Sequence, residues 1–273
     1  MPYKLFSKKF LTIATQRCMS QYTKTELSNG IKTITMCDTK TRNSLSINMM
    51  GDLIKNIKDT NNTDLRVIII TSEGPVFSAG HNLKEIAQDP LKQRTCFNLA
   101  SELMFSIIDS PVPVIAKVDG VAAAAGCQLV AQCDIAVCTD RSKFSTPGAN
   151  FGIFCSTPGI ALARCVNKMA TLHMLLAGLP VSAEEAKNIG LVTQVCKPEM
   201  LDEYLQVICT AITTKSRDVI ELGKRFYYKQ IQYDIRKAYE LGADKMVDNL
   251  QIPDCQEGIK SFIEKRKPQW SKK

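Results

Sequence analysis

The sequence predicts an α/β fold, in which a mostly parallel sheet is followed by a helical C-terminal region. Between residues 65 and 139, short apolar runs rich in β-branched residues alternate with stretches of helical period. This alternation is typical of parallel strands joined by crossover helices. From residue 198 onward every segment has a helical period, and no strand run follows. A chain of 273 residues forms one large domain, or one domain with an appendage.

A hairpin and an amphipathic helix come first. Residues 23–38 contain two extended runs about Ser28-Asn29-Gly30, a sequence that favours a tight turn between antiparallel strands. Residues 46–59 predict a helix, with Ser46 as its N-cap. Its apolar stripe consists of Met50, Leu53, Ile54 and Ile57.

The remaining elements are predicted from the lengths of the apolar runs and from the period at which apolar residues recur. The predicted order is a strand (65–71), a loop that turns into a helix (72–86), a helix (91–108), a strand (111–118), a helix within 121–134 and a strand (133–139). Four helical segments then begin with "PEMLDEY", "RDVIELG", "DIRKAYE" and "CQEGIKS". The sequence contains neither a low-complexity linker nor a short-period repeat.

Composition and charge exclude several classes of protein. The chain is 45% hydrophobic and 23% charged, which is ordinary for a globular protein. Its net charge of +8 is concentrated at residues 1–25, which contain no acid, and at 260–273, where six bases accompany one acid. The middle of the chain is nearly neutral, which argues against a broad nucleic-acid surface. No uncharged apolar run is long enough for a membrane span.

The N-terminus and the cysteines indicate a compartment. Residues 1–22 are basic, rich in Ser and Thr and free of acids, the pattern of a mitochondrial transit peptide and therefore of a matrix protein. The alternative for this segment is a disordered basic tail. The eleven cysteines include no C-x-x-C pair, which argues against a disulfide framework or a zinc site and favours reduced thiols inside a cell.

The stretch "VAAAAGCQLVAQCD", residues 121–134, places small residues at a corner between a strand and a helix. Small side chains let a ligand approach the backbone closely. The first turn of a helix also has unpaired N–H groups, and its dipole favours negative charge. The corner therefore has the features of a site for a developing anion. The alternative is that the alanines only pack the helix tightly against the strand.

From about residue 25 to its end, the chain resembles the crotonase, or enoyl-CoA hydratase/isomerase, family. The resemblance rests on six collinear blocks: "TKTRNSLSINMM", "VFSAGHNLKEI", "PVPVIAKVDGVAAAAGCQLVAQCDIAV", "FSTPGANFGIF", "SAEEAKNIGLVTQV" and "EGIKSFIEKRKPQW". It implies a crotonase-like spiral of ββα units over residues 23–197 and a helical trimerisation region over 198–273. It also implies homotrimers or homohexamers, acyl-CoA thioester ligands and a role in fatty acid and lipid metabolism.

The resemblance assigns an oxyanion hole to the backbone N–H groups of His81 and Ala125. Two such donors polarise a thioester carbonyl and stabilise its enolate. Gly80 and Gly126 would let the backbone approach the ligand. The family usually has glycine at the position of Ala125, so the hole must tolerate a β-carbon here.

The chain departs from the family's hydratases at two positions. Those hydratases have glutamates where this chain has Gln128 and Gly148, and the two carboxylates activate water and move the proton. An amide cannot exchange protons near neutral pH, and glycine has no side chain. Because general acid–base catalysis contributes roughly 10²- to 10⁴-fold, conventional hydration is not expected.

Other residues near the predicted site have structural or functional interpretations. The His81 imidazole titrates in a useful range and either faces the pocket or points to solvent. Cys155 and Ser156 are candidates for lining the acyl pocket. We interpret Cys127 as a packing residue and Asp134 as structural.

The resemblance also assigns contacts with coenzyme A, the only cofactor-like group expected, as part of the acyl-CoA ligand; no metal is expected. The assigned residues are Lys40, Arg42, Gly80, Leu83, Lys84, Gly126, Phe262 and Lys265, the last pair approaching the ligand of a neighbouring subunit. The alternative is that the lysines are solvated surface charges.

Three functions remain open from the sequence. The leading hypothesis is an acyl-CoA-binding enzyme that is not a hydratase and that runs an enolate-type reaction, such as decarboxylation of a malonyl-type thioester. The second is a non-catalytic acyl-CoA sensor or regulatory protein. RNA binding, known for some members of the family, is a weaker alternative because no basic and aromatic motif supports it.

Overall fold

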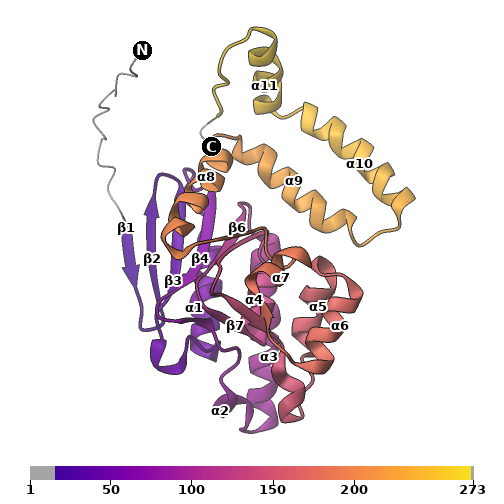
Figure 1. Cartoon of the computed structure of the whole chain (residues 1–273). Coiled ribbons are helices and arrows are strands. Elements are labelled where there is room, and N and C mark those ends of the chain that lie inside the picture. The colour runs from indigo at the N-terminus through magenta and orange to yellow at the C-terminus, as the bar shows by residue number, and fades with distance from the viewer. Residues whose placement is uncertain (1–15, 272–273) are drawn as a thin grey trace.

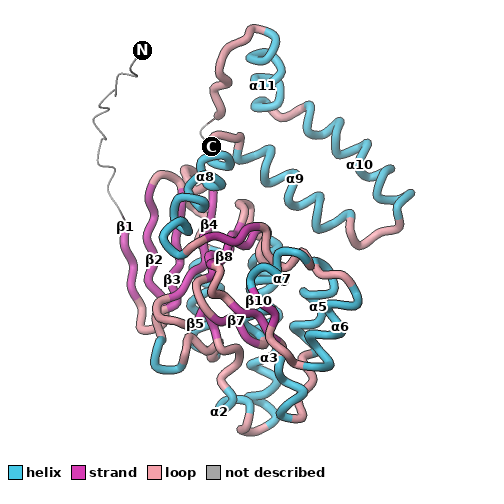
Figure 2. The backbone as a smooth tube through the Cα atoms, viewed as in Figure 1, coloured by secondary structure: helices cyan, strands magenta, loops and turns pink. Residues whose placement is uncertain are grey.

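The computed structural model describes residues 16–271 and contains two sheets with helices packed around them (Figures 1 and 2). The larger sheet has the strand order β1-β2-β3-β4-β6-β8-β11, and the smaller has the order β10-β9-β7-β5. The larger sheet comprises β1 (Gln16–Met19), β2 (Thr23–Ser28), β3 (Ile31–Met36), β4 (Val67–Ser72), β6 (Val114–Val118), β8 (Ile135–Thr139) and β11 (Gln194–Cys196). The smaller comprises β5 (Val76–Ser78), β7 (Val121–Ala123), β9 (Lys143–Ser145) and β10 (Val181–Ser182).

Helices cover the larger sheet on both faces. The helices before the last strand are α1 (Ile47–Lys58), α2 (Leu83–Ile86), α3 (Pro90–Asp109), α4 (Ala125–Gln132), α5 (Ser156–Cys165), α6 (Lys168–Ala177) and α7 (Ala183–Asn188), and those after it are α8 (Leu201–Thr213), α9 (Arg217–Gln230), α10 (Ile235–Leu250) and α11 (Pro253–Ile263). Along β4, Ile68 and Ile70 join the main core, whereas Val67 and Ile69 pack with residues of α8. This two-sided burial explains why β4 reads as a continuous apolar run.

The predicted hairpin and parallel core are confirmed. Asn29 and Gly30 both have positive φ, which is what a two-residue turn between β2 and β3 requires. The strands β3, β4, β6, β8 and β11 are parallel, so the α/β class also holds. Ser46 caps α1 by accepting a hydrogen bond from the Met49 N–H at 3.2 Å.

The short strands of the smaller sheet were not predicted. β5 lies within the segment expected to be a loop, and β7 lies just before the predicted helix that is now α4. Strands of three residues are too short to show a period of two in the sequence. Their parallel pairing matters for function, because β5 and β7 end side by side and deliver the two corners of the candidate site.

The predicted transit peptide lies mostly outside the described residues. Residues 16–19 form β1, which pairs antiparallel with β2 and so extends the sheet into the segment assigned to the leader. The boundary at residue 22 remains a prediction. At the other end, every described element after residue 197 is helical. Within the described part of the chain, no helix has the length and apolar character needed to cross a bilayer.

The last two helices leave the core after α9. Figure 1 shows α10 and α11 extending away from the sheets, and α10 buries none of its residues. The inner face of α9 carries Lys224, whose ammonium lies 2.7 Å from the Asp134 carboxylate and donates to the carbonyls of Ile107 (2.8 Å) and Val112 (3.1 Å). The interpretation of Asp134 as structural agrees with this geometry.

Asp134 is fully engaged in this network. Its carboxylate also accepts hydrogen bonds from the Val114 N–H at 2.7 Å and from the Tyr228 hydroxyl at 2.8 Å. Tyr228 stands one helical turn after Lys224, so α9 presents both groups on one face. Burial lowers the pKa of the Lys224 ammonium, and the neighbouring Asp134 carboxylate opposes that shift.

We predict that Lys224→Met costs about 3–5 kcal/mol of unfolding free energy, because it leaves the Asp134 carboxylate, which is only 16% exposed, without its cation. Urea denaturation followed by circular dichroism measures the loss. The matched control is Lys237→Met on α10, where the Lys237–Glu240 pair is exposed to solvent and its loss should change stability little. Equal effects of the two substitutions would contradict the role assigned to Lys224.

Candidate functional site

Two backbone corners meet at the carboxyl ends of β5 and β7. Gly80, after β5, has φ of +89°, and a β-carbon added to it would lie 2.9 Å from the Ala124 β-carbon and 3.2 Å from the Ala125 nitrogen. Only glycine fits both this conformation and this contact. The structure thus brings together the two loops that carry the predicted oxyanion-hole residues, His81 and Ala125.

The start of α4 lies against β5 with no space between them. A β-carbon added to Gly126 would lie 2.5 Å from the Ser78 carbonyl oxygen, so glycine is needed here for close approach rather than for a special φ. Ala124, the residue before the helix, has φ of +50° and ψ of −118°, which is unusual for a residue with a β-carbon. Its N–H donates to the Ser145 carbonyl at 2.8 Å, which holds the corner in that conformation.

Ser78 and Asn43 hold the first corner, and sequence analysis did not single them out. The Ser78 hydroxyl donates to the Asn43 carbonyl at 2.7 Å and accepts from the Gly80 N–H at 3.2 Å. The Asn43 amide donates to the carbonyls of Glu73 (2.9 Å) and Val76 (2.8 Å). Both side chains are buried, and the only sequence signal was their place in the "TRNSL" and "VFSAG" blocks.

The two predicted donors are available. Leu45 donates to the Gly80 carbonyl at 2.8 Å and bridges to His81, but this pairing does not use the His81 N–H. Ala125 is the first residue of α4, so its N–H has no partner within the helix. Across the described residues, neither N–H donates a hydrogen bond to a protein acceptor.

Gln128 occupies the first of the two positions where the family's hydratases have a glutamate, and its side chain is buried and unpaired. Its side chain is 4% exposed, and its Oε1 has no hydrogen-bond partner among the described residues. A buried acceptor without a partner costs about 1–3 kcal/mol, so its retention calls for a functional explanation. Gln128 stands in the first turn of α4, three residues after Ala125.

The second position, Gly148, has no room for a side chain. A β-carbon there would clash with the Ile153 carbonyl oxygen and lie 2.7 Å from the Cys155 Sγ. Cys155 is buried at the start of α5, whereas Ser156 is exposed. A carboxylate therefore cannot be added at residue 148 without moving this loop. Burial raises the pKa of the Cys155 thiol, so the group stays protonated near neutral pH.

The His81 ring does not point to solvent, so that alternative is wrong. It packs edge-on against Phe97 of α3, with ring centroids 5.3 Å apart, and its Nδ1 lies 3.6 Å from the Cys96 Sγ. Its Nε2 is buried and has no hydrogen-bond partner within residues 16–271. Burial lowers the pKa of His81, although the Leu45 carbonyl opposes the shift, so the imidazole is neutral at pH 7.

The predicted coenzyme A contacts fall into two groups. Lys40, Arg42, Leu83 and Lys84 are exposed on the segments next to the first corner, and the Arg42 carbonyl accepts from the Ala79 N–H at 3.1 Å. Phe262 lies in α11 and Lys265 two residues after its end, and Figure 1 shows α11 far from α2. Within one chain the structure does not bring these two groups together.

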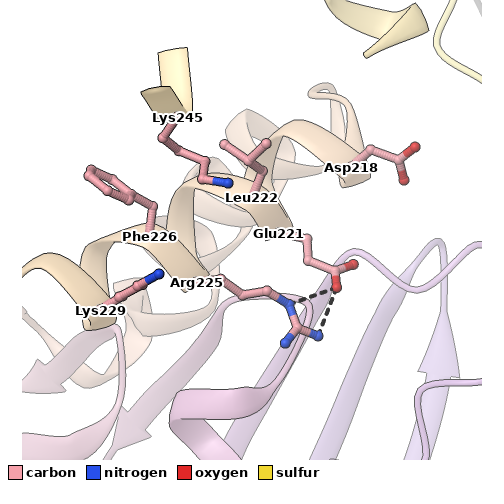
Figure 3. Close-up of a pocket in the computed structure, with 7 residues that line it drawn as sticks. All are labelled: Asp218, Glu221, Leu222, Arg225, Phe226, Lys229 and Lys245. Carbon is pink, nitrogen blue, oxygen red and sulfur yellow. Dashed lines mark hydrogen bonds and ion pairs between the residues drawn. The ribbon is translucent and has the colours of Figure 1, made fainter. Parts of the chain in front are cut away.

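A separate cavity of about 430 Å³ opens between α9 and α10, away from both corners (Figure 3). It is lined by Asp218, Glu221, Leu222, Arg225, Phe226, Lys229 and Lys245. None of these residues was a predicted site residue. The described residues also contain no cluster of three His, Cys, Asp or Glu side chains that suits a metal ion.

We predict that Gly126→Ala destabilises the fold by about 1–3 kcal/mol, because the new methyl group overlaps the Ser78 carbonyl. The control is Gly51→Ala in α1, where the added carbon has no described neighbour within 4 Å apart from the helix's own backbone, and the change stabilises the helix by about 0.5–1 kcal/mol. Thermal unfolding compares the two variants. Similar effects would mean that the close contact at the corner has been misplaced.

The second prediction concerns the stability of the fold at acidic pH. His81 has a folded-state pKa below its ordinary value, so the unfolded chain binds the extra proton as the pH falls below about 6.5. Stability should therefore fall from pH 7 to 5, with a slope of at most about 1.4 kcal/mol per pH unit from this group. His81→Asn should reduce this dependence of the unfolding free energy on pH, measured by urea denaturation at each pH. The control is His173→Asn at the second histidine, which is exposed, and this change should leave the dependence on pH unaltered.

Comparisons with known proteins agree with the fold. Residues 26–273 match the family model described as enoyl-CoA hydratase/isomerase. The chain is 49% identical over 246 residues to the human mitochondrial enoyl-CoA hydratase domain-containing protein 3, covering 89% of this chain and 81% of that protein. It is 48% identical to the mouse protein of the same name, covering 91% and 84%.

Solved structures give the same result. The crystal structure of the human protein superposes with a TM-score of 0.89 at 48% identity, covering 92% of this chain and 100% of that one. An enoyl-CoA hydratase from Mycobacterium smegmatis superposes with a TM-score of 0.86 at 37% identity, covering 94% and 98%. The chain belongs to the enoyl-CoA hydratase/isomerase family.

Proposed function

We propose that this protein binds an acyl-CoA thioester and stabilises its enolate with the N–H groups of His81 and Ala125. One observation carries the proposal: two N–H groups that have no acceptor in the described part of the chain lie on corners that touch. Because the corners are fixed by buried contacts, the donors need no rearrangement when charge develops on the thioester oxygen. Losing one such donor typically costs roughly 10²- to 10³-fold in turnover.

The coenzyme A part of the ligand would lie along the exposed bases beside the first corner. Lys40, Arg42 and Lys84 provide positive charge for phosphates, and Leu83 is 58% exposed, available to the adenine. Binding energy from these distant groups can hold the reacting carbon in place. We assign Phe262 and Lys265 to the ligand of a neighbouring subunit, because α11, which contains the first and ends just before the second, lies far from α2 within one chain.

Hydration is not the proposed reaction. Gln128 cannot take or give a proton near neutral pH, and Gly148 has no room for a carboxylate. Without a general base to activate water, addition across an enoyl double bond lacks its main catalytic contribution.

Decarboxylation of a malonyl-type thioester suits the remaining groups. The bond between the α-carbon and the carboxylate breaks, carbon dioxide leaves, and the electron pair of that bond forms the enolate held by the two N–H groups. A proton from water then reaches the α-carbon, which gives the shortened acyl-CoA. Only the oxyanion hole is needed for the bond-breaking step. The same lack of proton-transfer groups also supports an acyl-CoA sensor without turnover as the second candidate.

We assign the protein to the mitochondrial matrix and to fatty acid or lipid metabolism. The N-terminal composition and the names of the mouse and human relatives support the location. A homotrimer or homohexamer is supported by exposed apolar residues on α10 and α11, among them Tyr239 (76% exposed) and Phe262 (85%). Light scattering that gave the mass of one chain would contradict this assembly.

The prediction for activity uses two thioesters. Purified protein should hydrate crotonyl-CoA at least about 10²-fold more slowly than an ordinary hydratase, because both carboxylates are missing. It should release carbon dioxide from malonyl-CoA, measured together with the acetyl-CoA formed. Gln128→Glu alone should not restore hydration, since residue 148 still has no carboxylate.

The variant that tests the oxyanion hole is Ala125→Pro, which removes one donor at the first helical position. Proline suits that position but disfavours the unusual conformation of Ala124 before it, so its effect on folding is measured alongside. Malonyl-CoA turnover should fall by roughly 10²- to 10³-fold, with the melting temperature as the check on folding. Hydration at the rate of an ordinary hydratase would refute the proposal. Binding without any turnover would favour the sensor.

A further inference from the structure

The Gln128 amide is the unexplained group of the site. It is 96% buried, yet its side chain forms no hydrogen bond with the described part of the chain. A carboxamide has one accepting and one donating end of nearly the same shape. Since no partner holds either end, a half-turn of the amide breaks no hydrogen bond and exchanges its Oε1 for its Nε2. The group can therefore offer a donor or an acceptor to a ligand.

The segments that form the site contain no negative charge. Residues 76–82, 121–132 and 143–163 include no acid. Glu85, on the neighbouring helix α2, is turned to α1, where it accepts from the Ile47 N–H at 2.9 Å. The site is thus free of the repulsion that a carboxylate at residue 128 would exert on an anionic acyl group.

The imidazole and the thiols beside the corners are neutral. Burial lowers the pKa of the His81 imidazole and raises the pKa of the Cys127 and Cys155 thiols. The start of α4 adds a favourable field for an anion, because helix N-termini have unpaired N–H groups and positive potential. An unpaired buried amide and the absence of acid at this helix start point to the same ligand chemistry.

We propose that Gln128 determines specificity for acyl-CoA thioesters whose acyl group carries a free carboxylate, by donating its Nε2–H to that carboxylate. The inference rests on the proposed function and names its substrate class. A glutamate at this position would repel the same carboxylate, so the amide is the feature that admits it. The amide takes no part in proton transfer and acts by binding and orienting the group that leaves.

The test compares malonyl-CoA with isovaleryl-CoA, whose branched end has nearly the shape of a carboxylate without its charge. Thermal shift titrations give both affinities, with acetyl-CoA as a third arm to account for product. The native chain should favour malonyl-CoA. Gln128→Met, of similar length but without a donor, should lower the ratio of malonyl to isovaleryl affinity several-fold, by roughly the strength of one hydrogen bond to a charged group.

Gln128→Glu should lower that ratio by about tenfold or more at pH 7.5, through repulsion between two carboxylates. The loss should shrink at pH 5, where a buried glutamate takes up a proton. A general packing defect would not depend on pH in this way. Isovaleryl-CoA binding in each variant shows that the corners and the coenzyme A contacts remain intact.

The possible results distinguish failure of this inference from failure of the proposed function. If the native chain bound both thioesters equally, or if neither variant changed the ratio, Gln128 would not select a carboxylate, while acyl-CoA binding would stand. If the native chain bound neither thioester, the proposed function would fall and this inference with it.

Discussion

The contact between the start of α4 and the end of β5 is the constraint on which the site depends. Gly126 has no space for a single methyl group against the Ser78 carbonyl, and Gly80 has none against Ala124. Because interiors pack at crystal-like density, such contacts fix two backbones to within a few tenths of an ångström. That precision is what a pair of N–H donors needs, since electrostatic stabilisation of an oxyanion comes from dipoles already in place.

Much of the fold was predictable because its signals are local. The Asn29-Gly30 turn, the Ser46 cap and the apolar run of β4 each depend on neighbours in the sequence. The second sheet was not predicted, because its strands of two or three residues are too short to show a period. The pairing of Lys224 with Asp134 was also not predictable, since ninety positions of chain separate the two and neither carries a pattern that names its partner.

The candidate site, too, was predictable from the sequence only in part. Family blocks placed Gly80, His81, Ala125 and Gln128 in the right two corners, but said nothing about what holds the corners in position. That work falls to Ser78 and Asn43, polar residues that look like loop residues in the sequence and are buried in the structure. The environment of His81 also required coordinates, because Cys96 and Phe97 lie on α3, 15 and 16 residues further along the chain, and no sequence pattern names them as its neighbours.

The anchoring of α9 has a consequence for protein engineering. Lys224 reaches the carbonyls of Ile107 and Val112, which flank the turn between α3 and β6, and neutralises a carboxylate just before β8. The C-terminal helices are therefore not a detachable module that begins where the strands stop. A chimaera that exchanges them with those of a relative should join the two sequences after residue 230, so that the lysine and its acid stay in the same parent.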